Sequence, residues 1–233
     1  RQASRSGSDQ ADTRRVPPAG GGQNQGRDDG CRKFSWKGWQ LDGCEKQGSS
    51  NFTIIPSLNH STISSAQRIL IIGCSGSGKT TLTRQLTEQT GLPVIHLDQE
   101  YFFPGWKEPK TEDWAKTVEQ LAARDQWIMD GNFSGTFKYR MPRADTIVFV
   151  DMPTWLCLWR VIKRTLRFHG QVRPGSAPGC AERFDAHFLG YVWRYNATRR
   201  PGILRVLEEQ RGLGKKVFRL RNGRDLKAFL ERI

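Results

Sequence analysis

The sequence predicts an α/β domain in which a mostly parallel, five-stranded sheet is flanked by helices and preceded by a disordered N-terminal tail. From Arg68 onward, short apolar runs alternate with longer amphipathic stretches, which is the pattern of βαβ units. Residues 1–66 are rich in Gly, Ser, Gln, Arg and Asp and show neither helical nor strand periodicity, so they bury too little apolar area to offset the entropy of ordering. We therefore expect a tail over residues 1–66 and one domain over residues 67–233.

Each element of the domain is expected from a run of the matching periodicity. The apolar runs place strands near residues 68–72, 93–97, 126–130, 145–151 and 216–220. The amphipathic stretches place helices near residues 79–90, 111–124, 153–168, 183–210 and 224–232. The fourth helix is expected to break at "RRPG", residues 199–202, because proline lacks the N–H that continues a helix. Five strands with covering helices make one doubly wound domain.

The net charge of +14 is concentrated in the last third of the chain. Residues 160–233 hold 18 Lys and Arg against 6 Asp and Glu, whereas residues 67–159 hold 10 against 11. Such an excess implies an anionic partner, and nucleotide phosphates, nucleic acid and a membrane surface all fit it.

Cysteine usage and hydropathy bear on the cellular setting. The five cysteines are odd in number and lack the close paired spacing of zinc or redox motifs, which favours a reducing compartment. No apolar run reaches the length of about 18 residues that spans a bilayer, and no signal-peptide pattern is present. We expect a cytoplasmic protein that is neither exported nor associated with a membrane.

The stretch "GCSGSGKT", residues 73–80, matches the P-loop pattern G-x-x-x-x-G-K-[ST] without a mismatch. Its glycines let backbone N–H groups surround anionic oxygens, the lysine reaches the outer phosphates, and the threonine hydroxyl binds Mg²⁺. A strand-like run precedes it and a helix-like run follows, as a P-loop requires. The expected nucleotide-binding residues of this P-loop NTPase fold are Gly73, Cys74, Ser75, Gly76, Ser77, Gly78, Lys79, Thr80 and Thr81.

A carboxylate is expected to complete a magnesium site with Thr80, and two strands end in an aspartate. We favour Asp130, because it precedes Gly131 and Asn132, a loop able to approach a ligand closely. Asp130 in a plain Asp-Gly turn is the alternative. Asp151 precedes a proline and is expected to cap the following helix or to lie behind the site.

The loop "HLDQEYFFPGW" is expected to face a phosphate acceptor. Asp98 ends the second strand, at the edge of the sheet where α/β proteins bind ligands, and could orient or deprotonate an acceptor hydroxyl. Its alternative role is to cap the loop. The aromatic residues of this loop could line a substrate or belong to the core; they are Tyr101, Phe102, Phe103 and Trp106.

A lid is expected over residues 160–182. The helix near 153–168 presents a cationic face of Arg160, Lys163, Arg164 and Arg167. A neighbouring apolar stripe is expected to anchor this helix on the domain, and it consists of Trp155, Trp159, Ile162 and Leu166. The helix runs into "GQVRPGSAPG", a Gly/Pro-rich segment that carries Arg173 and suits a mobile cover. Arg160, Arg164 and Arg173 are the expected transition-state cations, with a merely solvated face as the alternative.

Neither the guanine-reading Asn-Lys-x-Asp stretch of GTPase switches nor a transporter signature occurs in the chain. The acidic loop and the basic lid instead favour transfer of a phosphoryl group from ATP to a small-molecule acceptor. The expected catalytic residues are Lys79, Asp98, Arg160, Arg164 and Arg173, with ATP and Mg²⁺ as cofactors.

Several blocks of the sequence resemble the DNA topology modulation proteins, P-loop relatives of adenylate and shikimate kinases. They are "IIGCSGSGKTTL", "HLDQEYFFPGW", "WIMDGNFSGT", "RADTIVFVDMPTWLCLWRVIKR", "GQVRP" and "FLGYVWRYNATRRP". The resemblance implies an adenylate-kinase-like core, ATP as donor and an arginine-bearing lid. "DGNFSGT" stands where adenylate kinases have Asp-Gly-Phe-Pro-Arg, and it lacks the arginine that grips a nucleoside monophosphate.

The name of that family raises a rival hypothesis, an ATP-binding regulatory protein that interacts with DNA. The basic last third would suit phosphate contacts, and "YVWRY" offers aromatic residues for stacking. However, Phe188, Tyr191, Val192 and Tyr195 are also spaced as the core face of a helix, which we favour. The sequence indicates neither the acceptor nor the oligomeric state.

Overall fold

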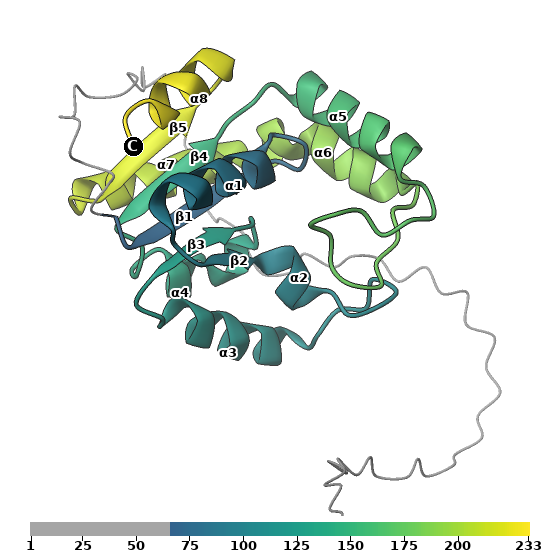
Figure 1. The fold of residues 1–233 in the computed structure, drawn as a ribbon, viewed down its shortest axis with the longest axis horizontal. Coiled ribbons are helices and arrows are strands. Elements are labelled where there is room, and N and C mark those ends of the chain that lie inside the picture. Colours follow the sequence, from purple (N-terminus) through teal and green to yellow (C-terminus); the bar gives the residue numbers. More distant parts are fainter. Residues whose placement is uncertain (1–65) are drawn as a thin grey trace, which may run out of the picture. The chain divides into compact units, whose positions relative to one another are not determined.

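A computed structural model describes residues 66–233, so all but the last residue of the predicted tail lies outside the described part. Its sheet has five parallel strands in the order β2-β3-β1-β4-β5 (Figure 1). The strands are β1 (Arg68–Gly73), β2 (Val94–His96), β3 (Trp127–Asp130), β4 (Thr146–Val150) and β5 (Lys216–Leu220). The predicted fold class is confirmed, and each strand lies within two residues of its expected bounds.

The middle of the sheet is buried on both faces. Every residue of β3 and β4 is buried, and Ile69–Ile72 of β1 have no accessible surface. Such continuous apolar runs are typical of parallel strands that are covered on both sides by helices. β1 lies between β3 and β4, so its carboxyl end, where the glycine loop begins, is at the centre of the sheet edge.

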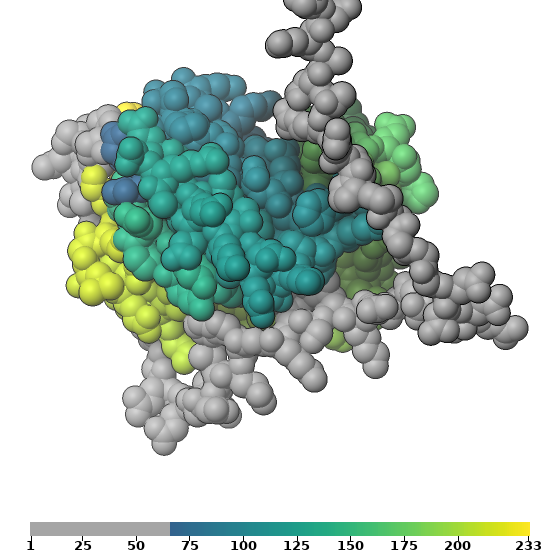
Figure 2. Space-filling model, turned by 90° about the horizontal axis from the view of Figure 1, so that it is seen from below, coloured from purple at the N-terminus to yellow at the C-terminus, as the bar shows by residue number. Residues whose placement is uncertain are grey.

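The helices cover both faces of the sheet, with α1 and α8 on the near side in Figure 1 and α7 behind it. They are α1 (Lys79–Thr90), α2 (Leu97–Tyr101), α3 (Thr111–Ala122), α4 (Phe137–Arg140), α5 (Thr154–Arg167), α6 (Ala186–Thr198), α7 (Arg200–Gly212) and α8 (Gly223–Leu230). Figure 2 shows the face covered by the teal residues around α3. The sequence did not indicate α2, α4 or the 3₁₀ turn Ser134–Thr136, which are all one turn or little more. No helix within residues 66–233 is both long enough and apolar enough to cross a membrane.

The apolar stripe of α5 does not anchor the helix, which corrects the expectation from its periodicity. Trp155, Trp159, Ile162 and Leu166 are 66, 55, 37 and 74% exposed, and we call this set the α5 ridge. The helix is instead buried through Cys157, Val161 and Thr165.

The glycine loop explains why α5 packs through its smaller side chains. A Cβ atom on Gly76 would lie 2.3 Å from the carbonyl oxygen of Cys157, so the backbone of α5 runs directly against the loop. A tryptophan cannot be accommodated at so close an approach, whereas cysteine and valine can. The packing of α5 is therefore set by the glycine loop and not by the largest apolar residues of the helix.

Candidate active site

The glycine loop between β1 and α1 requires glycine at two of its positions for steric reasons. Gly73 and Gly76 have φ angles of +155° and +79°, which L side chains rarely adopt. A Cβ atom would lie 2.6 Å from the carbonyl oxygen of Val150 at Gly73 and 2.3 Å from that of Cys157 at Gly76. The P-loop conformation therefore follows from the sequence pattern and from the two elements packed around it.

Lys79 is folded back across the glycine loop. Its Nζ donates hydrogen bonds of 2.9 Å to the carbonyl oxygens of Gly73 and Cys74. An ammonium group has three protons, so these two bonds leave the group able to donate in a third direction. The lysine thus stands at the mouth of the loop before any phosphate is bound.

Thr80 and Asp130 face each other from α1 and the end of β3. The Thr80 hydroxyl donates to Asp130 Oδ2 over 3.1 Å, and His96 Nδ1 lies 3.4 Å from the same oxygen. Asp130 is buried, and its other oxygen, Oδ1, has no hydrogen-bond partner among the described residues. A buried carboxylate oxygen without a partner is costly in a protein that binds nothing there.

This pair fits a magnesium ion. Mg²⁺ prefers oxygen ligands and commonly takes one or two from the protein, completing its shell with waters and phosphate oxygens. Thr80 Oγ1 and Asp130 Oδ1 are oxygens of that kind. No group of three or more His, Cys, Asp or Glu side chains within residues 66–233 could hold a metal ion by itself. A magnesium ion at Thr80 and Asp130 would take its remaining ligands from water and phosphate oxygens.

Asp151 does not cap α5, which corrects one of its two expected roles. The helix begins after Pro153, whose side chain makes no capping bond. The Asp151 carboxylate instead accepts from Arg200 Nε over 2.9 Å and from Arg219 Nε over 2.7 Å. These cations follow it by 49 and 68 residues, so no local pattern could indicate them.

Asp98 lies in the first turn of α2, directly after β2, and not in an open loop. The surrounding protein raises the pKa of this carboxyl above its ordinary value of 3.8, and Asp130 raises it further. Lys79, Arg173 and Arg164 oppose that shift. The residue is nevertheless exposed, so water reduces the desolvation that drives the shift.

The three predicted arginines reach the same region from α5 and the lid. Arg160 Nη1 donates to the carbonyl oxygens of Gly76 and Ser77, both at 3.3 Å. Arg164 and Arg173 both contact Glu182, a buried carboxylate that the sequence did not single out. Burial lowers the pKa of the Arg164 guanidinium, and the neighbouring Arg173 adds to this effect.

The segment between α5 and α6, which the sequence predicts to be a lid, packs on the residues that follow α2. Gly105 N–H donates to the Gly179 carbonyl oxygen over 3.1 Å, and Trp106 Nε1 donates to that of Ala181 over 2.8 Å. At its other end, a Cβ on Gly175 would lie 3.7 Å from Thr80 Cγ2. In Figure 1 the connection between α5 and α6 accordingly descends toward α2. The lid therefore bridges the glycine loop and the Asp98 segment.

Asn132 and Arg140 support the site, and sequence reasoning assigned a role to neither. Asn132 Oδ1 accepts from the Gly73 N–H over 2.9 Å. Arg140 has no accessible surface and donates to the carbonyl oxygens of Gly131, Asn132 and Phe133, which fixes the loop after β3. Burial lowers the pKa of Arg140 to about 9. Arg140 is the last residue of the short helix α4 and follows Lys138 and Tyr139, so its neighbours in the sequence gave no signal that it would be buried.

The aromatic residues of the Asp98 segment divide between packing and exposure. The Tyr101 ring packs 4.9 Å from Trp114 and 4.7 Å from Phe133, measured between ring centroids. Phe102 packs on Trp106, whereas Phe103 is exposed. Most of this set therefore holds the segment in place, which leaves Phe103 open to a ligand.

Several basic residues of the last third are engaged inside the domain. Arg200 and Arg219 bind Asp151, and the Lys215 ammonium donates to the carbonyl oxygens of Met141, Pro142 and Ala144. Residues 188, 191, 192 and 195 pack on or within the core, as expected for a core face of α6. These contacts leave fewer basic and aromatic side chains on the surface for the DNA binding that the rival hypothesis requires.

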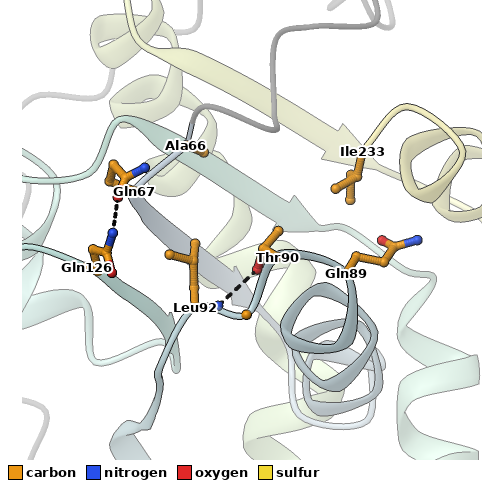
Figure 3. A pocket seen from close by; sticks show the side chains of 8 residues that line it. Ala66, Gln67, Gln89, Thr90, Leu92, Gln126 and Ile233 are labelled. Atoms are coloured by element: carbon orange, nitrogen blue, oxygen red, sulfur yellow. Dashed lines mark hydrogen bonds between the residues drawn. The ribbon is translucent and has the colours of Figure 1, made fainter.

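One hollow lies far from these residues, at the amino ends of the strands (Figure 3). Its lining includes Gln67 before β1, Gln126 before β3, Thr90 at the end of α1 and Leu92 beyond it. Its volume is about 240 Å³. Because α/β sheets bind ligands at the carboxyl ends of their strands, the P-loop edge is the candidate site and this hollow is not.

The parallel sheet, the glycine loop and the Thr80–Asp130 pair together define a P-loop domain with a kinase-type fold. A family model described as an AAA domain matches residues 69–167. The curated "uncharacterized AAA domain-containing protein ycf46" of Gracilaria tenuistipitata var. liui is 31% identical over 93 residues, and the match covers 38% of this chain and 19% of that protein. The match thus spans about a fifth of the relative's length.

Solved structures that resemble the chain include two shikimate kinases. The enzyme from Acinetobacter baumannii in complex with shikimate has a TM-score of 0.47 and 17% identity, covering 74% of this chain and 93% of that one. The enzyme from Bacteroides thetaiotaomicron has a TM-score of 0.45 and 15% identity, covering 72% and 96%. Likeness of this degree carries no argument about activity. The resemblance to DNA topology modulation proteins is not tested by these matches and stays a prediction.

Proposed function

We propose that this protein is an Mg²⁺- and ATP-dependent phosphotransferase that acts on a small-molecule acceptor. One arrangement carries the proposal: Asp98 follows β2 at the carboxyl edge of the sheet, and the segment that carries Arg173 packs on the residues that follow α2. Lys79, Arg173 and Arg164 accordingly oppose the rise in the pKa of Asp98. A protein that only binds or hydrolyses a nucleotide does not need a carboxylate between the P-loop and a segment that carries arginines. A transferase needs that carboxylate to receive the acceptor.

The residues of the chain divide into donor and acceptor groups. Backbone N–H groups of the glycine loop and Lys79 would bind the outer phosphates of ATP. Asp98 would orient the acceptor hydroxyl and take its proton. Arg160, Arg164 and Arg173 would stabilise the charge that spreads over the transferring phosphoryl group, while the lid excludes water.

A magnesium ion at Thr80 and Asp130 would neutralise phosphate charge and orient the phosphates. The partnerless Oδ1 of Asp130 supports this placement. The acceptor class, ATP as the donor and a cytoplasmic location all belong to the proposal.

ATP consumption in the presence of candidate acceptors tests the proposal. The panel consists of nucleosides, nucleotides, sugars and small hydroxy acids, each assayed with the wild type, Lys79→Ala and Asp98→Asn. We expect one acceptor class to raise the turnover of ATP, Lys79→Ala to abolish it, and Asp98→Asn to lower it by about 10²–10⁴-fold.

Two controls separate transfer from hydrolysis. Lys116→Ala changes an exposed lysine of α3, remote from the P-loop in sequence, and should leave turnover unchanged. Asp98→Asn should retain ATP binding, because the variant keeps the whole donor side. If no acceptor raises turnover above a slow hydrolysis that Asp98→Asn leaves unchanged, the protein is not a transferase of this kind.

A further inference from the structure

The α5 ridge is an unusual surface for a globular domain. Four of the nine large apolar side chains that are exposed within residues 66–233 belong to it. At 3.6 residues per turn, these four side chains fall within an arc of about 60°. Contiguous apolar surface of this kind generally marks an interaction site, whereas single exposed apolar residues do not.

The charged residues of α5 are all positive. The helix contains four Lys and Arg and no Asp or Glu. Arg160 and Arg164 turn toward the glycine loop and Glu182, but Lys163 and Arg167 are exposed beside the ridge. The Lys163 ammonium lies 5.1 Å from the ring centroid of Trp159, so charge and aromatic surface adjoin directly.

These charges restrict what can cover the ridge. Residues 1–65 carry 9 Lys and Arg against 6 Asp and Glu, so this segment of the chain is itself positively charged. A second copy of the ridge would bring its own lysine and arginine against the same residues. Like charges disfavour both occupants, whereas an anionic surface complements the ridge.

We propose that the α5 ridge docks the protein on an anionic lipid bilayer. A helix that carries Trp and Leu on one side and Lys and Arg beside them lies in the interface plane of a membrane, with its apolar side chains among the headgroups. Tryptophan is enriched at this depth, where its ring is apolar and its N–H is solvated. The anionic cytoplasmic leaflet attracts nearby lysine and arginine.

The shape of the ridge also suits a bilayer better than a peptide. Its side chains project from one helix, and Trp155, Trp159 and Leu166 are each more than half exposed. Recognition of a peptide helix usually requires a groove that covers the ligand from two sides. A fluid headgroup layer instead adapts to projecting side chains.

This surface does not depend on the proposed phosphotransfer, although Arg160 is on the same helix. It also requires no spanning segment, so it is compatible with the described helices being too short or too polar to cross a bilayer. The expectation that the protein has no membrane contact rested on the lack of a spanning segment and of a signal-peptide pattern. A helix that lies in the membrane interface needs neither.

Co-sedimentation of the full chain with vesicles tests the proposal. Vesicles of phosphatidylcholine with about 30% phosphatidylserine are compared with phosphatidylcholine alone, at about 0.1 M and about 0.5 M salt. We expect binding to the anionic vesicles that weakens at high salt. Leu166→Ala combined with Trp159→Ala should lower the binding constant by about tenfold or more. Lys163→Glu should lower it by a similar factor, because it reverses a charge at the surface.

Matched substitutions elsewhere control for general effects. Leu213→Ala removes an equally exposed leucine, and Lys227→Glu reverses an exposed lysine on α8. Both should leave vesicle binding unchanged, and circular dichroism should show all variants folded, because none of these side chains is buried.

Three results would overturn the proposal. The first is no sedimentation with anionic vesicles. The second is binding that Leu213→Ala reduces as much as the double variant Leu166→Ala, Trp159→Ala does. The third is a concentration-dependent dimer, seen by light scattering, that the double variant Leu166→Ala, Trp159→Ala dissociates, because this would assign the ridge to a second copy.

Discussion

Asn132 Oδ1 accepts a hydrogen bond of 2.9 Å from the backbone N–H of Gly73, and this bond joins the loop after β3 to the first residue of the P-loop. The Tyr195 hydroxyl lies 3.4 Å from the same oxygen. Arg140 in turn holds the loop that carries Asn132 through three backbone carbonyls. Arg140, a buried cation whose hydrogen bonds among residues 66–233 go to backbone carbonyls and to Thr136, therefore fixes, through the Asn132 amide, the residue where the P-loop begins.

Two substitutions of Asn132 should separate stability from nucleotide binding. Asn132→Ala leaves the Gly73 N–H without its acceptor and should lower the free energy of unfolding by about 1–3 kcal/mol. Asn132→Asp keeps the acceptor, so the free protein should be more stable than the alanine variant. It also adds a negative charge beside the phosphates, so ATP should bind more weakly than to Asn132→Ala.

Urea unfolding and titration calorimetry with ATP measure these two quantities. If Asn132→Ala has the same free energy of unfolding as the wild type, the hydrogen bond from the Gly73 N–H to Asn132 does not stabilise the P-loop. An equal affinity of both variants for ATP would show that Asn132 does not face the phosphates.

Asp130→Asn should remove the effect of magnesium on ATP affinity without destabilising the free protein. The amide replaces a buried carboxylate whose Oδ1 has no partner among the described residues, so the free energy of unfolding should stay equal or rise. Calorimetry with and without Mg²⁺ should show tighter ATP binding with the ion only in the wild type. Removing the ion with EDTA should make the wild type resemble the variant.

Thr80→Ser provides the control for this metal site. It keeps the hydroxyl that faces Asp130 and should retain the magnesium effect, whereas Thr80→Val should lose it. Persistence of the full effect in Asp130→Asn would move the metal site away from this pair.

Local patterns in the sequence were sufficient to predict the strands and the P-loop. A P-loop is specified by consecutive residues, because the conformation of Gly73 and Gly76 and the reach of Lys79 depend on the pattern itself. The strands were equally visible, since parallel strands buried on both faces form continuous apolar runs.

The remaining features depend on partners that are distant in the sequence. Glu182 matters because Arg164 and Arg173 both contact it, and neither contact follows from its neighbours in the chain. Periodicity correctly grouped the residues of the α5 ridge on one side of the helix. It could not show which side packs, because the close approach of α5 to Gly76 decides that.

The stability of the protein should depend on pH through Asp98. Its pKa is raised above 3.8 by the surrounding protein and then by Asp130, so between 3.8 and the raised value the native state holds a proton that the unfolded chain has released. The free energy of unfolding contributed by Asp98 therefore falls as the pH rises through that window. Asp98→Asn, which has no such proton, should gain stability relative to the wild type as the pH rises from about 3 to about 7.

Thermal unfolding of both proteins across this range measures the difference. The direction of the shift would be contradicted if the free energy of unfolding of Asp98→Asn, minus that of the wild type, stayed constant or fell as the pH rises. The rate of the transfer reaction should also fall as the pH drops through the pKa of Asp98, with a midpoint above pH 3.8. Only the ionised carboxylate accepts the proton of an acceptor hydroxyl.

Two lid glycines allow the docking of the lid to be tested against a matched control. Gly175 and Gly179 have φ angles of +81° and +70°, so alanine is strained to a similar extent at both, by about 1–2 kcal/mol. At Gly175 the new Cβ would lie 3.7 Å from Thr80, an ordinary contact. At Gly179 it would lie 2.8 Å from the Cβ of Pro104, which follows the Asp98 helix α2. Only Gly179→Ala should therefore push the lid off the Asp98 segment.

Hydrogen exchange over the lid reports this difference. Gly179→Ala should speed exchange at Gly105 N–H, which donates to the Gly179 carbonyl oxygen, and should expose the segment to proteases. Gly175→Ala should show the smaller change that backbone strain alone produces. If the two variants exchange alike, the contact with Pro104 does not hold the lid. If Gly179→Ala alone also slows acceptor-dependent turnover while ATP binding persists, the contact serves to bring the lid arginines to Asp98, because the donor side is built without it.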